Sequence, residues 1–419
     1  MTDTDSRGFL ASGHLPTLVG ALLYFDVSFM VWVLLGPLAP FLRDELRLTA
    51  TQQGLLVAVP LLGGSLFRPA LGMLGDRLGG RKAGLIGLGL TIVPLVIAWK
   101  LARGIGQFYA VGLLLGIAGA SFAVALPLAS AWYPPEYQGL AMGIAGAGNS
   151  GSLLATFAAP RLAQRFGWAE TFGIMTLPVL VVFMLFAAIV RDGPSARPRT
   201  QWRDWAEIVK EPDTLWFSFL YSLTFGGFVG FASFLTSFFH DQYHVSKVTA
   251  GDLTTVVVLA GSFLRPVGGW IADRVGGYRV LLLLLVGVAA CLTAVATLPA
   301  LSAAVLLLFA TVGCLGMGNG AVFQLVPQRF GTRLGLVTGI VGAAGGLGGF
   351  FLPSLLGAAK DATGTYGSGI AILAAAFFAG AIVLVQLGSV WVARWPADAV
   401  SRARLFCYRR LTRQVFSSM

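Results

Sequence analysis

Two arginines, Arg68 and Arg265, lie inside long apolar runs of the sequence, where a charged side chain is costly. Each stands 8 residues before an aspartate, Asp76 or Asp273, that opens a polar connection. In a helix this spacing puts each arginine about 12 Å deep, near the middle of a bilayer, where a charge costs about 2.5–3.5 kcal/mol. Both side chains must therefore face an interior. The planar, forked guanidinium group suits a planar oxyanion, so the pair predicts a central anion site, and a purely structural pairing is the alternative.

Asp26 is the acid that the sequence places inside an apolar run. It stands 9 residues into the first run, at a depth of roughly 13 Å, similar to that of the arginines. Two arginines and an ionised aspartate leave a charge of +1, which one monovalent anion neutralises. Protonation of Asp26 raises the charge to +2 and attracts the anion more strongly, which is the logic of proton symport. A structural aspartate–arginine pair, or an aspartate that faces water at the end of a shifted span, remains the alternative.

The composition places these groups in a membrane. Of 419 residues, 56% are hydrophobic and 11% are charged, and the mean hydropathy is +0.80; an average soluble domain has about 25% charged residues. A soluble protein of this size cannot bury so much apolar side chain, which excludes a cytosolic enzyme, a disordered tail and a fibrous repeat. The 55 glycines suit close helix packing, and the continuous apolar runs exclude a β-barrel.

Apolar runs of about 20 residues predict twelve transmembrane helices. They cover 17–41, 51–75, 82–100, 105–132, 138–160, 169–190, 214–239, 249–272, 279–299, 302–327, 334–358 and 366–392. With the N-terminus inside, the cytoplasmic segments hold 19 Lys and Arg and the external segments hold 8. This bias predicts that both termini are cytoplasmic.

The chain is predicted to be a tandem duplication. Residues 64–82 and 261–279 match at 9 of 19 positions with an offset of 197, and 139–147 matches 335–343 at an offset of 196. Six spans are an even number, so the two halves have parallel topology. The predicted divisions are an N-terminal six-helix half (1–190), a cytoplasmic linker (191–213), a C-terminal six-helix half (214–392) and a basic cytoplasmic tail (393–419).

Several motifs resemble a known family. The loop GMLGDRLGGRK (72–82), echoed at 269–276, resembles the loop motif of the major facilitator superfamily. The glycine-rich spans GLAMGIAGAGNSGSLLATFAAP (139–160) and GLVTGIVGAAGGLGGFFLP (335–353) resemble the paired nitrate signatures of the nitrate/nitrite porter (NarK-type) family. The resemblance covers the chain except its tails. It implies an all-α membrane protein with twelve transmembrane helices in two six-helix parallel repeats, the major facilitator fold.

The resemblance also implies a substrate-binding set of two charged, three aromatic and two amide side chains: Arg68, Arg265, Tyr221, Phe122, Phe225, Asn149 and Asn319. In the family the two arginines are the anion ligands. We expect the two phenylalanines to sandwich a flat anion, and the tyrosine and the amides to donate hydrogen bonds to its oxygens. Tyr24 and Gln324 are lesser polar candidates.

Two further sets belong to the conformational change that transport requires. The signature glycines are Gly143, Gly146, Gly148, Gly342, Gly345 and Gly346. Their spacing is typical of close helix packing, and their faces are expected to approach the anion or to slide against a neighbouring helix. The conformational-gate loops contain Asp76, Arg77, Asp273 and Arg274.

Other patterns are set aside. Residues 146–151 fit a dinucleotide-binding glycine motif, but they lie inside an apolar span with no preceding strand. His240 and His244 have the spacing of metal ligands, but the charged neighbours Asp241 and Lys247 indicate an exposed loop. The three cysteines show neither a disulfide nor a metal pattern. We expect no cofactor, no metal and no nucleic-acid partner.

Taken with the resemblance, these features predict a monomeric, multi-pass nitrate transporter of the bacterial cytoplasmic membrane that works by alternating access and is not an enzyme. Its partners are nitrate, with nitrite as a second substrate, protons and membrane lipid. Proton-coupled import through Asp26 is the preferred mode, and the sequence is compatible with a role in nitrate assimilation and with one in respiration. The alternatives are nitrate/nitrite antiport, transport of another small oxyanion or carboxylate, and a transporter-like sensor that binds without moving substrate.

Overall fold

A computed structural model describes residues 8–193, 202–330, 334–403 and 405 of the chain. Every regular element in these residues is helical, in agreement with the predicted all-α fold. The predicted linker and the predicted basic tail lie partly outside the described residues, so both stay predictions.

The N-terminal half, residues 8–193, contains eleven helical segments. They are η1 (Phe9–Ala11), α1 (Leu15–Trp32), α2 (Leu35–Leu46), α3 (Ala50–Leu78), α4 (Gly80–Lys100), α5 (Ile105–Gly119), α6 (Phe122–Ser130), α7 (Pro135–Gly146), η2 (Ala147–Ser150), α8 (Gly151–Phe166) and α9 (Trp168–Ile189).

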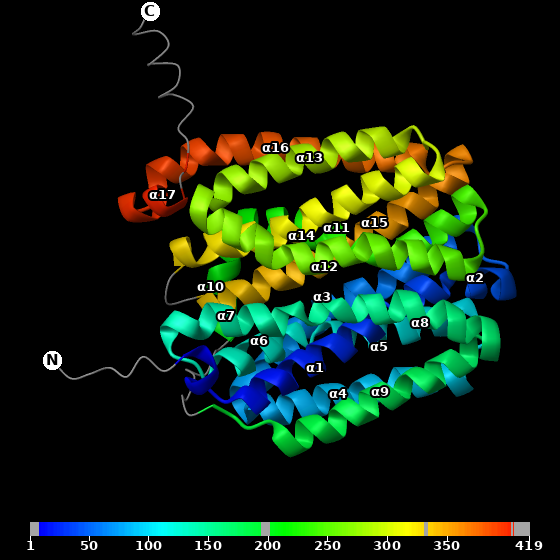
Figure 1. Ribbon diagram of the computed structural model, residues 1–419, viewed down its shortest axis with the longest axis horizontal. Coiled ribbons are helices and arrows are strands. Elements are labelled where there is room, and N and C mark those ends of the chain that lie inside the picture. The colour runs from blue at the N-terminus through cyan, green and yellow to red at the C-terminus, as the bar shows by residue number, and fades with distance from the viewer. Residues whose placement is uncertain (1–7, 194–201, 331–333, 404, 406–419) are drawn as a thin grey trace, which may run out of the picture.

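The described residues from 202 onward contain the helices of the C-terminal half together with α10, in the predicted linker, and α17, in the predicted tail. These helices are α10 (Trp202–Lys210), α11 (Pro212–Tyr243), α12 (Lys247–Val275), α13 (Gly277–Ala296), α14 (Leu301–Phe330), α15 (Leu334–Thr363), α16 (Gly367–Arg394) and α17 (Ala397–Ala403). Figure 1 shows the long helices of both halves running along a common direction, with the N-terminal half below the C-terminal half.

Eleven helical runs among the described residues are long and apolar enough to cross a membrane, with α1 and α2 counted as one run and α5 and α6 as another. The predicted span 138–160 corresponds to α7, η2 and α8, which follow one another without a loop. The short 3₁₀ segment η2 divides this run into pieces of 12 and 16 residues. Glycine favours such breaks because it has low helix propensity, and Gly146, Gly148 and Gly151 surround the division.

The repeat is visible in the helix boundaries. The first residues of α11, α12 and α13 each follow those of α1, α3 and α4 by 197 positions. Gly79 and Gly276 occupy the same place in the two halves, between the second and third spans, with φ of +88° and +101°. This left-handed conformation favours glycine, which explains why both loop motifs keep a glycine there.

The two ends of the molecule are distinct. The described segments η1, α10 and α17 all lie at the left end of Figure 1, whereas α2 lies at the right end. We call these the terminal end and the α2 end. Large apolar side chains are exposed on the flanks of the long helices, with Met184 68% and Leu283 71% exposed. An apolar flank of this kind suits contact with lipid.

Candidate functional site

Arg68 is fixed between the two halves. It lies in α3 and is only 1% exposed. Its Nε donates to the Gly119 carbonyl at 3.1 Å, and its Nη1 donates to the carbonyl of Gly342, which belongs to α15 of the other half. Its Nη2 is buried and has no hydrogen-bond partner among the described residues. The guanidinium is therefore anchored on two sides and keeps one nitrogen for a ligand.

Three aromatic rings from separate helices surround this guanidinium. The Arg68 Cζ lies 5.2 Å from the ring centre of Phe122, 5.3 Å from Trp32 and 5.5 Å from Phe225. The Trp32 and Phe225 rings stack at 6.3 Å between centroids with an interplanar angle of 22°. A cation beside aromatic rings in a dry site is stabilised by about 2 kcal/mol or more, which offsets part of the cost of burying it.

Arg265 lies on α12 at the repeat-related position and approaches the same cluster from the C-terminal half. It is half-buried, and its Cζ lies 6.0 Å from the ring centre of Phe323. That ring meets Tyr221 edge-on at 4.9 Å and Phe122 at 6.4 Å. The Arg265 Nη1 is buried and has no hydrogen-bond partner among the described residues.

Tyr221 connects the two arginines. Its ring stacks on Phe225 at 5.1 Å and 6°, and its buried hydroxyl is close enough to Arg265 and Arg68 to interact electrostatically with both. The hydroxyl has no hydrogen-bond partner among the described residues. Five predicted site residues thus form one connected cluster: Arg68, Arg265, Tyr221, Phe122 and Phe225.

The glycines of α15 let that helix approach the cluster. A Cβ added at Gly345 would lie 2.7 Å from the Tyr221 ring and 2.9 Å from Phe225. At Gly342 it would lie 3.3 Å from Phe122, and at Gly346 it would lie 2.5 Å from the Ser65 hydroxyl. These three predicted glycines therefore form a wall of the cluster without side chains.

The glycines of the N-terminal half behave differently. A Cβ at Gly143 or Gly146 would have no neighbour within 4 Å, whereas one at Gly148 would lie 2.8 Å from the Asp26 amide nitrogen. Only Gly148 of this predicted set allows a close helix contact, and that contact joins η2 to α1.

Two buried amides remain without partners. Asn149 in η2 and Asn319 in α14 are each 0% exposed, and both atoms of each amide have no hydrogen-bond partner among the described residues. An unsatisfied buried polar group costs about 1–3 kcal/mol, so these amides are suited to bind something that the protein itself does not supply.

Asp26 faces η2. One carboxylate oxygen accepts a 2.6 Å hydrogen bond from the Ser150 hydroxyl, and no ion pair to Asp26 occurs among the described residues. The neighbouring Phe25 contacts Phe122 at 5.6 Å, so Asp26 lies beside the aromatic cluster and outside it. The structural aspartate–arginine pair, the alternative that the sequence left open, is therefore not formed within the described part of the chain.

The lesser candidates lie elsewhere. Tyr24 packs against Phe186 at 5.3 Å, and its hydroxyl approaches α4 at Gly87. Gln324 accepts a hydrogen bond from the Gly277 amide at the start of α13. These contacts direct both side chains to helix packing and away from the cluster.

At the α2 end, polar contacts join the two halves. The ion pairs are Arg43–Asp241, Lys247–Asp44 and a bidentate Arg161–Asp252, and a hydrogen bond of 3.0 Å joins Gln53 to Ser237. The carboxylate of Asp361 accepts from the amides of Ala50 and Thr51 at 3.0 and 2.8 Å, which caps the N-terminus of α3. These ion pairs and hydrogen bonds between the two halves close this end.

At the terminal end, several described charged contacts lie within one half. Arg329 of α14 pairs with Glu211 and Asp213, while Asp192 accepts from the Arg81 amide at 2.8 Å. Trp391 and Trp395 also donate to Asp213, at 2.9 and 3.1 Å.

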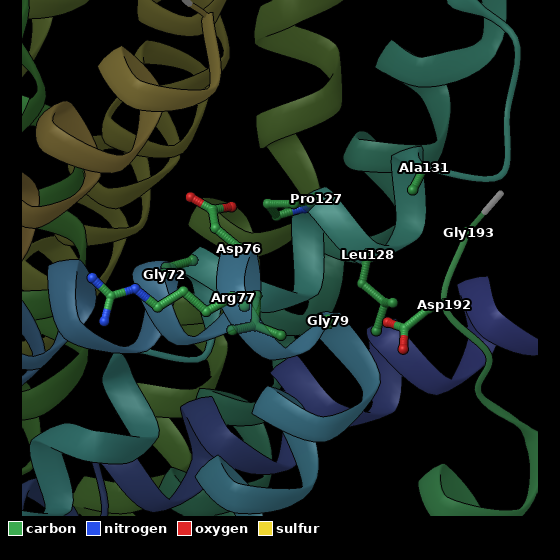
Figure 2. A pocket seen from close by; sticks show the side chains of 13 residues that line it. Gly72, Asp76, Arg77, Gly79, Pro127, Leu128, Ala131, Asp192 and Gly193 are labelled. Atoms are coloured by element: carbon green, nitrogen blue, oxygen red, sulfur yellow. The ribbon is translucent and has the colours of Figure 1, made fainter. Parts of the chain in front are cut away.

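The predicted gate loops also lie at the terminal end. Asp76 and Arg77 line a cavity of about 330 Å³ between α3 and α6, and Figure 2 shows their side chains extending in different directions, with Asp192 near Gly79. In the C-terminal half, Asp273 is exposed and the Arg274 guanidinium lies 3.9 Å from the Trp270 ring centre.

Sequence reasoning missed three residues of this region. The residues around Trp32 in the sequence do not indicate that it belongs to the site. Its ring is placed by Gly64 and Gly119, which leave space for it and are distant in sequence. Phe323 follows Asn319 by four residues, one helical turn, which is the signal that could have found it. Ser150 stands directly beside Asn149, and the signal that could have found it is its hydroxyl, a natural partner for a buried carboxylate.

The arrangement combines two cations from different halves, flat aromatic walls and unsatisfied donors, and it can bind a small planar anion.

Comparisons with known proteins give the family. The Major Facilitator Superfamily model matches residues 21–353. The solved xylose transporter XylE from E. coli, in a partially occluded inward open conformation, is 15% identical with a TM-score of 0.72, covering 90% of this chain and 99% of that chain. A crystal structure of a D-xylose-proton symporter has the same identity and TM-score, covering 92% and 98%.

Curated relatives are more similar in sequence. The probable nitrate/nitrite transporter NarK2 of Mycobacterium tuberculosis (strain ATCC 25618 / H37Rv) is 38% identical over 83% of this chain and 90% of its own length. The nitrite extrusion protein of Bacillus subtilis is 34% identical over 86% and 91%, and the probable nitrate transporter NarT of Staphylococcus carnosus is 32% identical over 86% and 92%. The chain therefore belongs to the major facilitator superfamily and, within it, to the nitrate/nitrite porter (NarK-type) family, as a multi-pass protein of the bacterial cytoplasmic membrane.

Proposed function

We propose that the chain transports nitrate across the cytoplasmic membrane by alternating access, with the anion held between Arg68 and Arg265. One observation carries this proposal: two guanidinium groups, one from each half, face a single aromatic cluster, and each retains a buried nitrogen without a partner among the described residues. The names of the relatives support nitrate or nitrite as the anion.

In this proposal nitrate lies flat beside the rings of Phe122 and Phe225 and takes hydrogen bonds from the free guanidinium nitrogens. The Tyr221 hydroxyl, which is close to both arginines, donates to a third oxygen. The amides of Asn149 and Asn319 supply further donors. A trigonal anion with three oxygens suits several converging donors, and the water-poor site strengthens each interaction.

The two ends of the molecule support alternating access. Cross-half ion pairs close the α2 end, while the described ion pairs of Arg329 at the terminal end join elements of the C-terminal half. Because the Lys and Arg bias favours a cytoplasmic terminal end, this arrangement corresponds to a site closed to the outside. Transport requires these contacts to separate so that the α2 end can open.

Proton-coupled import through Asp26 is the mode we prefer. Two arginines and an ionised Asp26 give +1, and a proton on Asp26 gives +2, which favours anion entry. Nitrate/nitrite antiport is the second candidate, because Asp26 bonds to Ser150 and contacts neither arginine, and because one relative is named a nitrite extrusion protein.

The test is nitrate uptake into proteoliposomes, driven by an imposed pH gradient or by internal nitrite. We expect gradient-driven uptake that is lost in Asp26→Asn, while exchange of internal for external nitrate persists in the variant. Uptake that ignores the pH gradient but is stimulated by internal nitrite would establish antiport. Saturable nitrate binding without flux in sealed vesicles would instead identify a sensor, and an absence of nitrate binding would exclude nitrate as the ligand.

A further inference from the structure

The joint between α1 and η2 lies next to the anion site and outside it. The Ser150 hydroxyl of η2 donates to the Asp26 carboxylate at 2.6 Å. Two glycines let the backbones touch: a Cβ at Gly148 would lie 2.8 Å from the Asp26 amide nitrogen, and one at Gly151 would overlap the Asp26 carbonyl. Both the side chain and the main chain of Asp26 therefore contact the 3₁₀ break of this span.

A 3₁₀ stretch inside a longer helical run commonly marks a hinge, because it can exchange for α-helical hydrogen bonding at low cost. Three features make this one suited to transmit a change at Asp26. Asn149, which has a buried and unsatisfied amide, belongs to η2 itself. The same segment contacts α12, the helix that carries Arg265. Phe25, next to Asp26, contacts Phe122 of the aromatic cluster.

Charged groups on the helices packed against α1 do not take the place of Ser150. The charged side chains of these helices are Arg68, Asp76 and Arg77 on α3, Arg81, Lys82 and Lys100 on α4, Arg161 and Arg165 on α8, and Glu170 on α9. The described part of α7 and the helices α5, α6 and η2 carry no charged side chain, although α5 and α7 contain the titratable Tyr109 and Tyr137; Glu136 on α7 lies outside the described side chains. On α1 itself, His14 bonds to Thr17. None of the described groups forms an ion pair with Asp26, so Ser150 is its partner at this joint.

Resting on the proposed function, we propose that Asp26 and Ser150 form a proton-sensitive latch on η2 that positions Asn149 and, through α12, the Arg265 side of the anion site. The ionised carboxylate accepts the serine hydroxyl and holds the 3₁₀ segment against α1. When Asp26 takes a proton, the serine loses its charged acceptor, and η2 is free to change its pairing. Asp26 and Ser150 are then positioning residues, since neither contacts the anion.

The first test is the pH profile of nitrate counterflow in proteoliposomes with equal pH on both sides. In Ser150→Ala the pH of half-maximal counterflow is expected to rise by about one unit, because a hydrogen bond that stabilises the ionised carboxylate is gone. Ser150→Thr keeps a hydroxyl and restores the original midpoint. Thr176→Val is the matched control, since Thr176 bonds only within its own helix, α9, and its loss leaves the midpoint in place.

The second measurement uses the unaltered protein, so it does not depend on how Ser150→Ala folds. Amide hydrogen exchange over 147–151 is expected to be slower at pH 8 than at pH 5.5 after correction for intrinsic rates, and this difference should vanish in Asp26→Asn. Identical protection at both pH values, or a Ser150→Ala profile that matches the unaltered protein, overturns the latch while leaving nitrate transport intact. An unaltered protein that moves no nitrate overturns the proposed function, and the latch with it.

Discussion

The two halves of the chain keep the same residues at repeat-related positions and use them differently. Arg68 and Arg265 are 197 residues apart, and so are Tyr24 and Tyr221. Arg68 is fully buried and bonded to two backbone carbonyls, whereas Arg265 is half-buried beside one ring. Tyr221 faces the arginines, but Tyr24 packs against Phe186. Duplication supplied the residues, and the surroundings then divided their roles.

The two halves also differ in the continuity of their helices. In the N-terminal half three runs are interrupted, between α1 and α2, between α5 and α6, and at η2. Their counterparts α11, α14 and α15 are continuous over 30 or more residues. The N-terminal half thus combines an anchored arginine on the continuous helix α3 with three interrupted runs, while the C-terminal half combines a less constrained arginine with continuous helices.

The largest expected effect separates the two arginines. Arg68→Ala removes two carbonyl bonds and the cation from among three rings, so nitrate uptake should be abolished and the free energy of unfolding should fall by about 3 kcal/mol. Arg265→Ala should lower uptake at least 100-fold while changing stability by less than about 1 kcal/mol. Uptake assays and thermal unfolding in detergent measure both. Equal losses of stability would contradict the assigned difference.

A second comparison tests the glycine signatures. Gly345→Ala places a methyl group 2.7 Å from Tyr221, and either the ring or α15 must move. We expect nitrate uptake to fall more than tenfold. Gly143→Ala, the matched control, enters open space and should keep uptake within about twofold, since alanine also favours a helix. Comparable uptake by the two variants would show that the α15 wall is not a constraint.

The smallest expected effect concerns the tyrosine pair. Tyr221→Phe keeps the stacked ring and removes one donor to the anion, so the Kd for nitrate should rise about tenfold, the cost of a hydrogen bond to a charged group. Tyr24→Phe removes the repeat-related hydroxyl and should leave the Kd within about twofold. Isothermal titration of the purified variants with nitrate gives both values, and a larger effect at Tyr24 would reverse the assignment.

Much of the fold could be predicted from sequence because its signals are local. Apolar runs predict the helices, and the duplicated loop motif predicts the repeat. The cost of burying a charge is enough to select Arg68 and Arg265 from their places in apolar runs. The division of 138–160 by η2 could not be predicted, since hydropathy does not distinguish a 3₁₀ turn from α-helix.

The partners of these residues could not be predicted because they depend on which helices meet. Arg43 and Asp241 are 198 positions apart and carry only the local signals of an external charge and an exposed loop, yet they pair across the halves. Ser150 is 124 positions from Asp26, and the bond between them depends on Gly148 and Gly151 admitting α1. A sequence without aligned relatives gives no sign of such pairs.

The contacts that close the α2 end also bear on transport speed. In an alternating-access cycle each contact must separate and re-form once per turnover. A contact that stabilises the closed state by about 1.4 kcal/mol, and that is already broken in the transition state for opening, slows the opening about tenfold. Partly exposed pairs such as Arg161–Asp252 contribute about 0.2–1 kcal/mol each and are weakened by salt. If the α2 end faces the outside, as the Lys and Arg bias predicts, these ion pairs together slow its opening, and we expect a higher external ionic strength to speed transport.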